Sequence, residues 1–573
     1  MNSIIFGIIF WAVMLGLVWL VRPGSGLLRI TMERWSAAHI MVTVLVLAAL
    51  IGSSSFLMTL CPMWNGEITA KLMEETRARA EEIKNSTGEE EWKRNAAAAM
   101  SANDPESDPD RFAIKNKNQY ELMADALLKG QIYLEYGDMD RRLLAMPNPY
   151  DTEARRAIGV RYHWDHAFYK GRYYMYFGVV PVFLLFIPFK LITGASLTTY
   201  HATQVFVGMS MIGLFLFFRL LSKRFFPKLS FAVYLFLGTA VSVTSMVHCI
   251  AKPAMYMTAF SSAFCMEIWS VYFYVKAVWA TEDENRAIFR AFLGALFGAL
   301  AFGCRPSIAL GNLIVIPCLI VFLRERRFTW KLLLKLVAAA SPYIIIGALL
   351  LAYNYIRFES PFEFGQSYQL TVTDQSGYSS LLSRLSIRKL VNGMIYFFIR
   401  TEDLISDFPH IVEGGIFFSY PVFIAGLYAL TGKKVRAALR ENKLIPFALG
   451  AVFAIIMIVL MDGVWSPYML SRYIEDLMWL VGMLVFLLVG LRFADAGPDR
   501  AGNAFPSAEI DSNIEASAKT GGENAEFSSV VCLLAIYSIF VCAFVFVQLD
   551  MDFFLPEQIV LIKKIIGGLT FGL

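Results

Sequence analysis

About twelve apolar runs, each close to the length that crosses a lipid bilayer, dominate the sequence. They lie near residues 3–22, 37–60, 198–222, 229–250, 255–276, 287–304, 306–323, 331–354, 414–431, 445–461, 474–492 and 528–548. The chain of 573 residues is 57% hydrophobic and only 17% charged, which is more apolar surface than a soluble domain buries. We therefore expect an all-α polytopic membrane protein with a bundle of about twelve transmembrane helices.

Charge and cysteine content exclude several other classes of protein. The net charge of +4 is too small to indicate nucleic-acid binding. The seven cysteines are scattered, mostly inside apolar runs, so we expect small buried residues rather than metal ligands or disulfides. The first apolar run lacks a basic leader and a cleavage site of small residues, and we expect a retained helix rather than a signal peptide.

Four basic segments set the expected orientation. They are Arg22, Arg29 and Arg34; Lys223, Arg224 and Lys228; residues 324–331 (RERRFTWK); and residues 433–443 (KKVRAALRENK). Loops rich in lysine and arginine face the cytoplasm. This rule places residues 61–197 and 355–413 on the external side.

The chain then divides into seven parts. They are two transmembrane helices (1–60), an external loop with juxtamembrane helices (61–197), transmembrane helices (198–354), a second external segment (355–413), transmembrane helices (414–493), a disordered cytoplasmic linker (494–527), and the last transmembrane helix with its tail (528–573). Within the external loop, the polar residues before 112 predict a helix followed by a mobile stretch.

Residues 177–193 form a further apolar stretch, which carries Pro181, Pro188 and Lys190. If it crossed the membrane, the second and first basic segments would fall on opposite sides. We therefore expect a juxtamembrane helix on the external face, where proline and lysine are tolerated. The alternative is that it does cross and that a short neighbouring run does not.

Two consecutive stretches carry a resemblance to a known family. Residues 118–151 (NQYELMADALLKGQIYLEYGDMDRRLLAMPNPYD) precede residues 164–194 (WDHAFYKGRYYMYFGVVPVFLLFIPFKLITG), which contain a Gly-x-x-Tyr stretch at Gly171, then Pro181 and Gly194. This order resembles the first external loop of the C-type glycosyltransferase superfamily, which includes protein O-mannosyltransferases and lipid A aminoarabinose transferases. Residues 303–307, 354–371 and 471–476 extend the resemblance over most of 115–495.

The resemblance implies transfer of a sugar from a polyprenyl-phosphate donor to a cell-envelope glycan, lipid or protein. The implied location is the outer face of a bacterial plasma membrane, with membrane lipids as further partners. The small net charge gives no reason to expect a nucleic-acid partner. Such a site needs cations for the leaving phosphate and a carboxylate that deprotonates the acceptor hydroxyl. It also needs aromatic surfaces for the sugar.

The catalytic base is where the sequence departs from the family. Aligning the family's Asp-Glu-x-x-Tyr pattern on Tyr120 places Asn116 and Lys117 at the two acidic positions. We favour Asp165 as the base, because it lies between aromatic residues at the entry to the juxtamembrane stretch; Glu121 and Asp125 are alternates. Asp165 could equally cap the following helix or pair with His166 or Lys170.

Three residues are predicted to bind the donor phosphate, namely Arg305, Arg472 and Tyr473. Arg305 lies between two apolar helices and needs an anion there, or else extends to lipid headgroups. Arg472 and Tyr473 open a span beside Glu475 and Asp476, so a phosphate clamp and an internal salt bridge are both open. The predicted substrate-lining residues are Tyr173, Tyr174, Lys252, Arg357 and Tyr368.

No resident cofactor is expected, although Asp138 and Asp140 have a spacing that can hold a divalent metal. Glu267 lies inside an apolar run and is either functional or hydrogen-bonded to a neighbouring helix. Two other functions compete with the transferase. One is a lipid or polysaccharide transporter or flippase, and the other is a non-catalytic assembly protein that kept the fold and lost the base.

Overall fold

The computed structural model of the chain describes residues 2–59, 66–102, 113–114, 119–137, 139–377, 384–400, 414–465, 470–494, 510–550, 556–557 and 560. The regular secondary structure of this part is helical apart from two small two-stranded sheets. Among the described residues, seven helices are long and apolar enough to cross a membrane. The predicted all-α membrane class is thereby confirmed in outline, while the count of about twelve spans stays a prediction.

The elements before residue 198 form the N-terminal helices and the first predicted external loop. They are α1 (Asn2–Leu20), α2 (Gly26–Arg29), α3 (Ala37–Thr59), α4 (Gly66–Asn85), α5 (Glu91–Ala102), β1 (Ala113–Ile114), α6 (Gln119–Leu128), α7 (Arg141–Ala145), α8 (Thr152–Ile158), β2 (Tyr162–His163), β3 (His166–Tyr169), β4 (Arg172–Met175), the π-helical segment η2 (Val182–Phe186) and α9 (Ile187–Thr193).

The remaining elements form most of the bundle. They are α10 (Thr199–Phe225), α11 (Phe231–Thr244), α12 (Val247–Ala251), α13 (Met255–Trp279), α14 (Glu284–Phe302), η3 (Ile308–Ile314), α15 (Val315–Arg324), α16 (Trp330–Phe358), η4 (Gln366–Tyr368), α18 (Ile387–Met394), η5 (Ile395–Ile399), α19 (Ile416–Ser419), η6 (Pro421–Phe423), α20 (Ile424–Thr431), α21 (Lys433–Glu441), α22 (Ile445–Trp465), η7 (Ser471–Ile474), α23 (Glu475–Leu491) and α24 (Ile510–Asp550).

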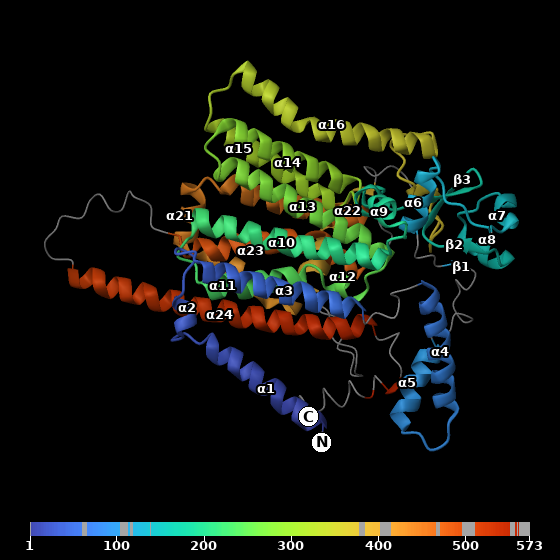
Figure 1. The fold of residues 1–573 in the computed structure, drawn as a ribbon, viewed down its shortest axis with the longest axis horizontal. Helices are drawn as coiled ribbons and strands as arrows, with labels where there is room; N and C mark the ends of the chain where they lie inside the picture. The colour runs from blue at the N-terminus through green and yellow to red at the C-terminus, as the bar shows by residue number, and fades with distance from the viewer. Residues whose placement is uncertain are drawn as a thin grey trace.

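The long helices run alongside one another, with α23 inside the bundle (Figure 1). Nearly every residue of α23 is buried, and its Phe486 stacks on Phe218 of α10 with ring centroids 4.0 Å apart. Some predicted apolar runs are broken helices. Residues 414–431, for example, divide at Tyr420, because the proline that follows disfavours helical backbone at the residue before it.

Hydrogen bonds and an ion pair gather all four basic segments at one end of the bundle. In Figure 1, α2 and α21 lie at this end, and β3, α7 and α8 lie at the other. The contacts are Arg224 Nε to Trp279 O (2.7 Å), Trp279 Nε1 to Asn442 O (3.1 Å), Lys443 Nζ to Glu325 Oε1 (2.7 Å) and Phe231 N to Ile30 O (2.7 Å). We call this the basic end of the bundle, and the end that carries β3 the hairpin end.

The orientation leads to a labelling prediction. Cysteines at Lys170 and Ser196, both exposed near the hairpin end, should react with a membrane-impermeant maleimide in intact cells. A cysteine at Lys434, exposed on α21, should react only after the cells are opened. The unmodified chain is the background control, because the cysteines of its described part are buried. Labelling of positions 170 and 196 from opposite sides would show that residues 177–193 cross the membrane.

The first predicted external loop contains a β-hairpin that the sequence analysis did not predict. Strands β3 and β4 pair antiparallel, and the two residues between them, Lys170 and Gly171, both have positive φ (47° and 75°). Such two-residue turns match the twist of a hairpin. Asp165 precedes β3 and has φ of 56°, so it does not cap a helix. The hairpin is a small departure from the predicted all-α class, which holds for most of the described residues.

Residues 182–193 form a short helix, η2 followed by α9, that packs against α6. At about 1.5 Å per residue, twelve residues reach about 18 Å, well short of the hydrocarbon core of about 30 Å. Lys190 pairs with Asp125 of α6, while Leu191 and Ile192 are exposed. These features agree with a helix lying at the membrane surface, which stays a prediction.

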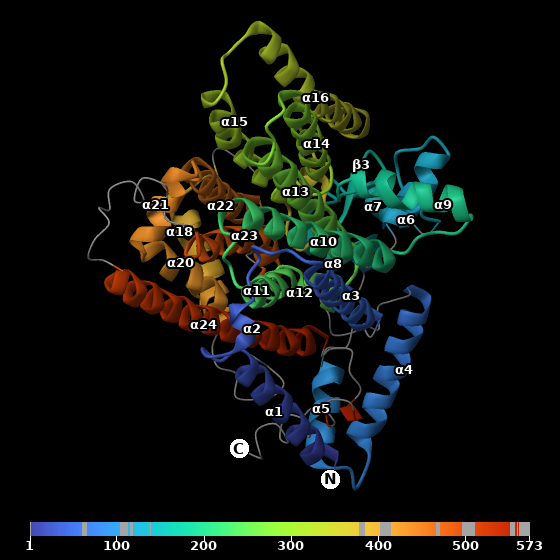
Figure 2. The ribbon, with the colours of Figure 1, turned by 60° about the vertical axis from the view of Figure 1, so that its left-hand side comes forward.

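Two predicted flexible segments have different outcomes. The predicted linker 494–527 is helical from Ile510 onward, because α24 continues the last apolar run backward. Extending an existing helix is far easier than starting one, so polar residues join it. The predicted mobile stretch around residues 103–112 lies outside the described residues. Before it, α4 and α5 pack on each other (Figure 2).

Gly178 allows the chain after the hairpin to lie directly on the end of α14. A Cβ at Gly178 would stand 2.2 Å from the carbonyl oxygen of Gly303, and Val180 N donates to that oxygen (3.0 Å). We expect Gly178→Ala to lower the free energy of unfolding by about 1–3 kcal/mol, because backbone must shift. Thermal unfolding in detergent measures this effect. Gly347→Ala on α16, where a Cβ meets nothing within 4 Å, is the control; equal melting temperatures would contradict the account.

Candidate functional site

A cavity of about 490 Å³ opens near the hairpin end, where both predicted external segments meet the helix ends. Five residues predicted for the site line it: Asp165, Arg305, Arg357, Arg472 and Tyr473. They come from positions up to 308 residues apart in sequence (473 − 165). The structure therefore brings together the favoured base and all three predicted phosphate ligands.

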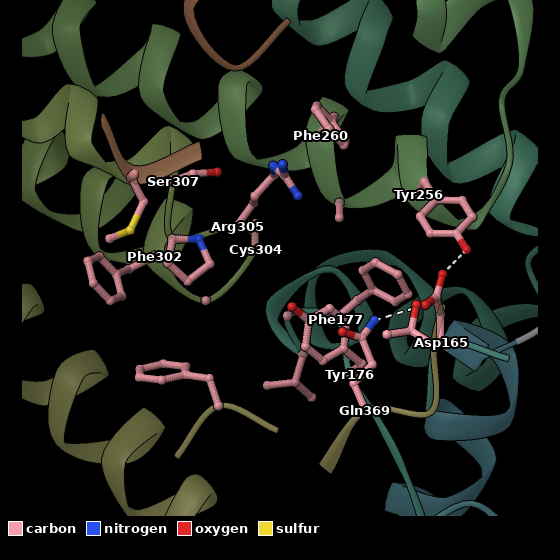
Figure 3. A pocket seen from close by; sticks show the side chains of 18 of the residues that line it. Asp165, Tyr176, Phe177, Tyr256, Phe260, Phe302, Cys304, Arg305, Ser307 and Gln369 are labelled. Atoms are coloured by element: carbon pink, nitrogen blue, oxygen red, sulfur yellow. Dashed lines mark hydrogen bonds between the residues drawn. The ribbon is translucent and has the colours of Figure 1, made fainter. Parts of the chain in front are cut away.

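Asp165 is buried on one side of this cavity (Figure 3). The hydroxyl of Tyr256, from α13, donates to Oδ2, and Gln369 Nε2 donates to Oδ1 (2.9 Å). The backbone N–H of Asp165 donates to Leu370 O (2.9 Å), which fixes its unusual φ. Burial raises the pKa of Asp165 above its ordinary value. A carboxylate with a raised pKa is a better proton acceptor near neutral pH.

His166, the next residue, is buried beneath the site and anchors this turn. Its Nδ1 lies 2.8 Å from the carbonyl oxygen of Trp164, so Nδ1 carries the proton, and its Nε2 accepts from the Tyr136 hydroxyl (2.6 Å). Burial lowers the pKa of His166 to about 3. His166 is therefore neutral and gives Asp165 no counter-charge, which excludes the predicted pairing of the two. Lys170 pairs with Glu359 instead.

Arg305 lies on the other side of the cavity, next to Phe260 (Figure 3). Its Nε and Nη2 each lie 2.9 Å from a different oxygen of Asp476, which is fully buried, and Ser307 Oγ donates to the same carboxylate (2.7 Å). Asp462 faces this pair as well. The guanidinium predicted to hold phosphate is thus already paired, and a phosphate would have to compete with Asp476.

Arg357 and Arg472 have no such partner. No carboxylate oxygen of the described residues lies within 4.0 Å of either guanidinium. Arg357 is buried and donates to Met175 O (2.9 Å) and Asn354 Oδ1 (2.7 Å), while Arg472 lies over the ring of Tyr256 at 4.7 Å. The Nε of each is buried without an acceptor. A buried guanidinium N–H that lacks an acceptor is stabilised by an anion, so these two arginines are candidates for binding a negatively charged group.

The alternate bases lie outside the cavity lining, on α6. Burial raises the pKa of Glu121 to about 7, and Asp125 adds to the rise. Asp125 itself is paired with Lys190 of α9. Neither carboxyl lines the cavity, whereas Asp165 does, so Asp165 is the better placed of the three candidate bases.

The predicted substrate-lining residues other than Arg357 lie away from the cavity lining. Tyr173 is buried against His163 and Phe168, and Tyr174 and Tyr368 pack on Phe358; within the described residues these three tyrosines and Lys252 do not line the cavity. Their predicted contact with substrate has no geometric support.

Of the two predicted metal ligands, Asp138 and Asp140, the structure describes only Asp140. Asp140 accepts hydrogen bonds from Arg142 and from Arg161 N (3.1 Å) and caps α7, and Arg142 holds its pKa well below the ordinary range. Asp138 lies outside the described residues.

Glu267 is buried in α13 and accepts a hydrogen bond from Asn312 of η3. This contact agrees with the prediction that Glu267 is hydrogen-bonded to a neighbouring helix.

Tyr256, Gln369 and Asp462 line the site and were not predicted. Gln369 falls inside the stretch that carries the family resemblance, and this was the one available signal. Tyr256 and Asp462 stand at helix ends with no local pattern that separates them from ordinary membrane residues. Asn116 and Lys117, which occupy the family's acidic positions, lie outside the described residues.

No protein-family model matches the chain, and no curated protein matches it either. The functional argument therefore rests on the cavity and on the residues that line it.

Proposed function

We propose that this protein transfers a glycosyl group from a polyprenyl-phosphate donor to a cell-envelope acceptor, and that the transfer takes place in the cavity at the hairpin end. One observation carries the proposal: the same cavity holds a buried carboxylate, Asp165, and two arginines, Arg357 and Arg472, that lack a carboxylate partner among the described residues. A proton acceptor and a phosphate site are the two groups that such a transfer requires.

The apolar part of the cavity suits the lipid of the donor. Phe177, Val179, Phe302 and Leu350 line it, and Phe302 is partly exposed on the outside of the bundle. A polyprenyl chain could lie along this side while its phosphate reaches the arginines. The resemblance to C-type glycosyltransferases supports the same class of donor.

The roles of the residues follow from this placement. Asp165 accepts the proton of the acceptor hydroxyl, and the acceptor oxygen forms a bond to the anomeric carbon of the sugar. The bond between that carbon and the phosphate oxygen breaks, and polyprenyl phosphate leaves with the bonding electrons. Arg357 and Arg472 stabilise the negative charge that the phosphate gains.

The basic segments support an external position for this chemistry. All four lie at the end of the bundle away from the hairpin, and such segments face the cytoplasm. We infer that the cavity faces the outside of a bacterial plasma membrane.

The test is a transfer assay in which the label shows what the protein does. Purified protein in lipid nanodiscs receives polyprenyl phosphate that carries a radiolabelled sugar, together with an envelope extract as acceptor. The proposal predicts that label leaves the polyprenyl lipid and that free polyprenyl phosphate appears. In proteoliposomes, label that crosses the bilayer while still on its lipid would instead support a flippase. Binding without transfer or transport would support a non-catalytic assembly protein.

A further inference from the structure

Three buried glutamines of the second external segment form a hydrogen-bonded chain that ends on Asp165. Gln366 Nε2 donates to Gln375 Oε1 (2.9 Å), and Gln375 Nε2 donates to Gln369 Oε1 (3.3 Å). Gln369 Nε2 then donates to Asp165 Oδ1 (2.9 Å). All four side chains are at most 8% exposed, so water cannot easily replace these bonds.

The hydrogen bonds along this chain of glutamines all run in one direction, from Gln366 toward Asp165. A glutamine amide has an oxygen at one end and an NH₂ group at the other, and an unsupported amide can rotate and exchange them. The oxygen of Gln369 is occupied by the NH₂ group of Gln375, so the NH₂ group of Gln369 faces the carboxylate. Gln375 thus settles which end of Gln369 meets Asp165, although it does not bond to Asp165 itself.

The other groups around Asp165 do not determine this orientation. From the bundle, Tyr256 donates to the second carboxylate oxygen and Arg472 contributes a positive charge at longer range. From the external segments, Trp164 and Thr371 also interact with the carboxyl. These groups favour the ionised form by acting on the carboxyl itself, whereas the oxygen of Gln369 accepts from Gln375.

We propose that Gln375, supported by Gln366, is a positioning residue that holds the Gln369 amide as a donor to the Asp165 carboxylate. This proposal rests on the proposed function in one respect, since it assigns Asp165 the role of base. The glutamine chain favours the ionised carboxylate against the opposing effect of burial, and it fixes the position of Oδ1. The acceptor hydroxyl therefore meets a carboxylate that is ready to take its proton.

A double-mutant cycle tests the glutamine chain through the titration of Asp165. We expect Gln369→Met to raise the titration midpoint by about one pH unit, because a donor to the charged form is lost. Gln375→Met should raise it by a smaller amount. The double variant should match Gln369→Met alone, since Gln375 acts only through Gln369. The readout is the acid limb of the pH–rate profile for transfer.

A second readout keeps this test separate from the proposed function. Infrared difference spectra between each variant and its Asp165→Asn counterpart isolate the carboxyl band of Asp165, and its loss with rising pH gives the midpoint without any turnover. If wild type transfers no sugar, the proposed function fails while the glutamine chain is still measured. The inference is overturned if Gln375→Met leaves the midpoint unchanged in folded protein. The inference is also overturned if Gln375→Met raises the midpoint by the same amount in the Gln369→Met variant as in the wild type.

Discussion

Asp165→Asn is expected to reduce the rate of sugar transfer by roughly 10²- to 10⁴-fold, the usual contribution of a general base. The substitution keeps the size of the side chain and removes its capacity to take a proton. The asparagine oxygen can still accept from Gln369 or Tyr256, so folding should be preserved. Donor binding should also be preserved, because Arg357 and Arg472 are untouched. Transfer rate and donor affinity are measured on the same preparation.

Glu121→Gln and Asp125→Asn are the matched controls for this prediction. Both remove a carboxylate from α6, outside the cavity lining, and both should transfer sugar at close to the normal rate. If Asp165→Asn keeps near-normal turnover while either control abolishes it, the base lies on α6. Asp165 would then be a structural residue of the turn before β3.

Arg472→Met and Arg357→Met are expected to weaken donor binding by roughly 10- to 100-fold each. Hydrogen bonds to charged groups contribute about 1.5–3 kcal/mol, and about 1.4 kcal/mol corresponds to tenfold in affinity. Methionine keeps the apolar contact of the arginine stem with its aromatic neighbours and removes the charge. Binding of a short-chain polyprenyl phosphate, followed by calorimetry in detergent, measures the effect without any need for turnover.

Arg305→Met is the informative comparison. Removing it leaves Asp476 buried and unpaired, so we expect a loss of stability of about 3–5 kcal/mol rather than a specific loss of binding. The double variant Arg305→Met/Asp476→Asn should recover most of this stability. The account would be contradicted if the double variant folds but cannot bind donor while the Arg357 and Arg472 variants bind it normally. That result would show that Arg305 binds the phosphate.

The helices, and the gathering of the four basic segments at one end of the bundle, were predictable because they depend on local composition. An apolar run shows itself in about 20 consecutive residues, and the basic segments are equally local. The structure adds the breaks within these runs, such as the one at Tyr420, which follow from single prolines. The hairpin at Lys170–Gly171 was also locally encoded, as a two-residue turn between aromatic stretches. It was missed because the same residues suggested the entry to a helix.

The site was predictable only in part, because it depends on partners that are distant in sequence. Asp165 and Arg472 could be chosen from their surroundings in the chain. The sequence does not reveal that Asp476 neutralises Arg305 across 171 residues, or that Gln369 reaches Asp165 across 204. The pairing of Arg305 with Asp476 determines which arginines remain available to bind a phosphate.

The central claim is that a donor phosphate binds between Arg357 and Arg472 with its sugar facing Asp165. The most direct measurement is a structure of the Asp165→Asn variant with polyprenyl-phosphate sugar bound. The account predicts phosphate oxygens within hydrogen-bond distance of Arg357 or Arg472, and the anomeric carbon next to residue 165. A phosphate held by Arg305 in place of Asp476, or a donor bound at the basic end of the bundle, would contradict it.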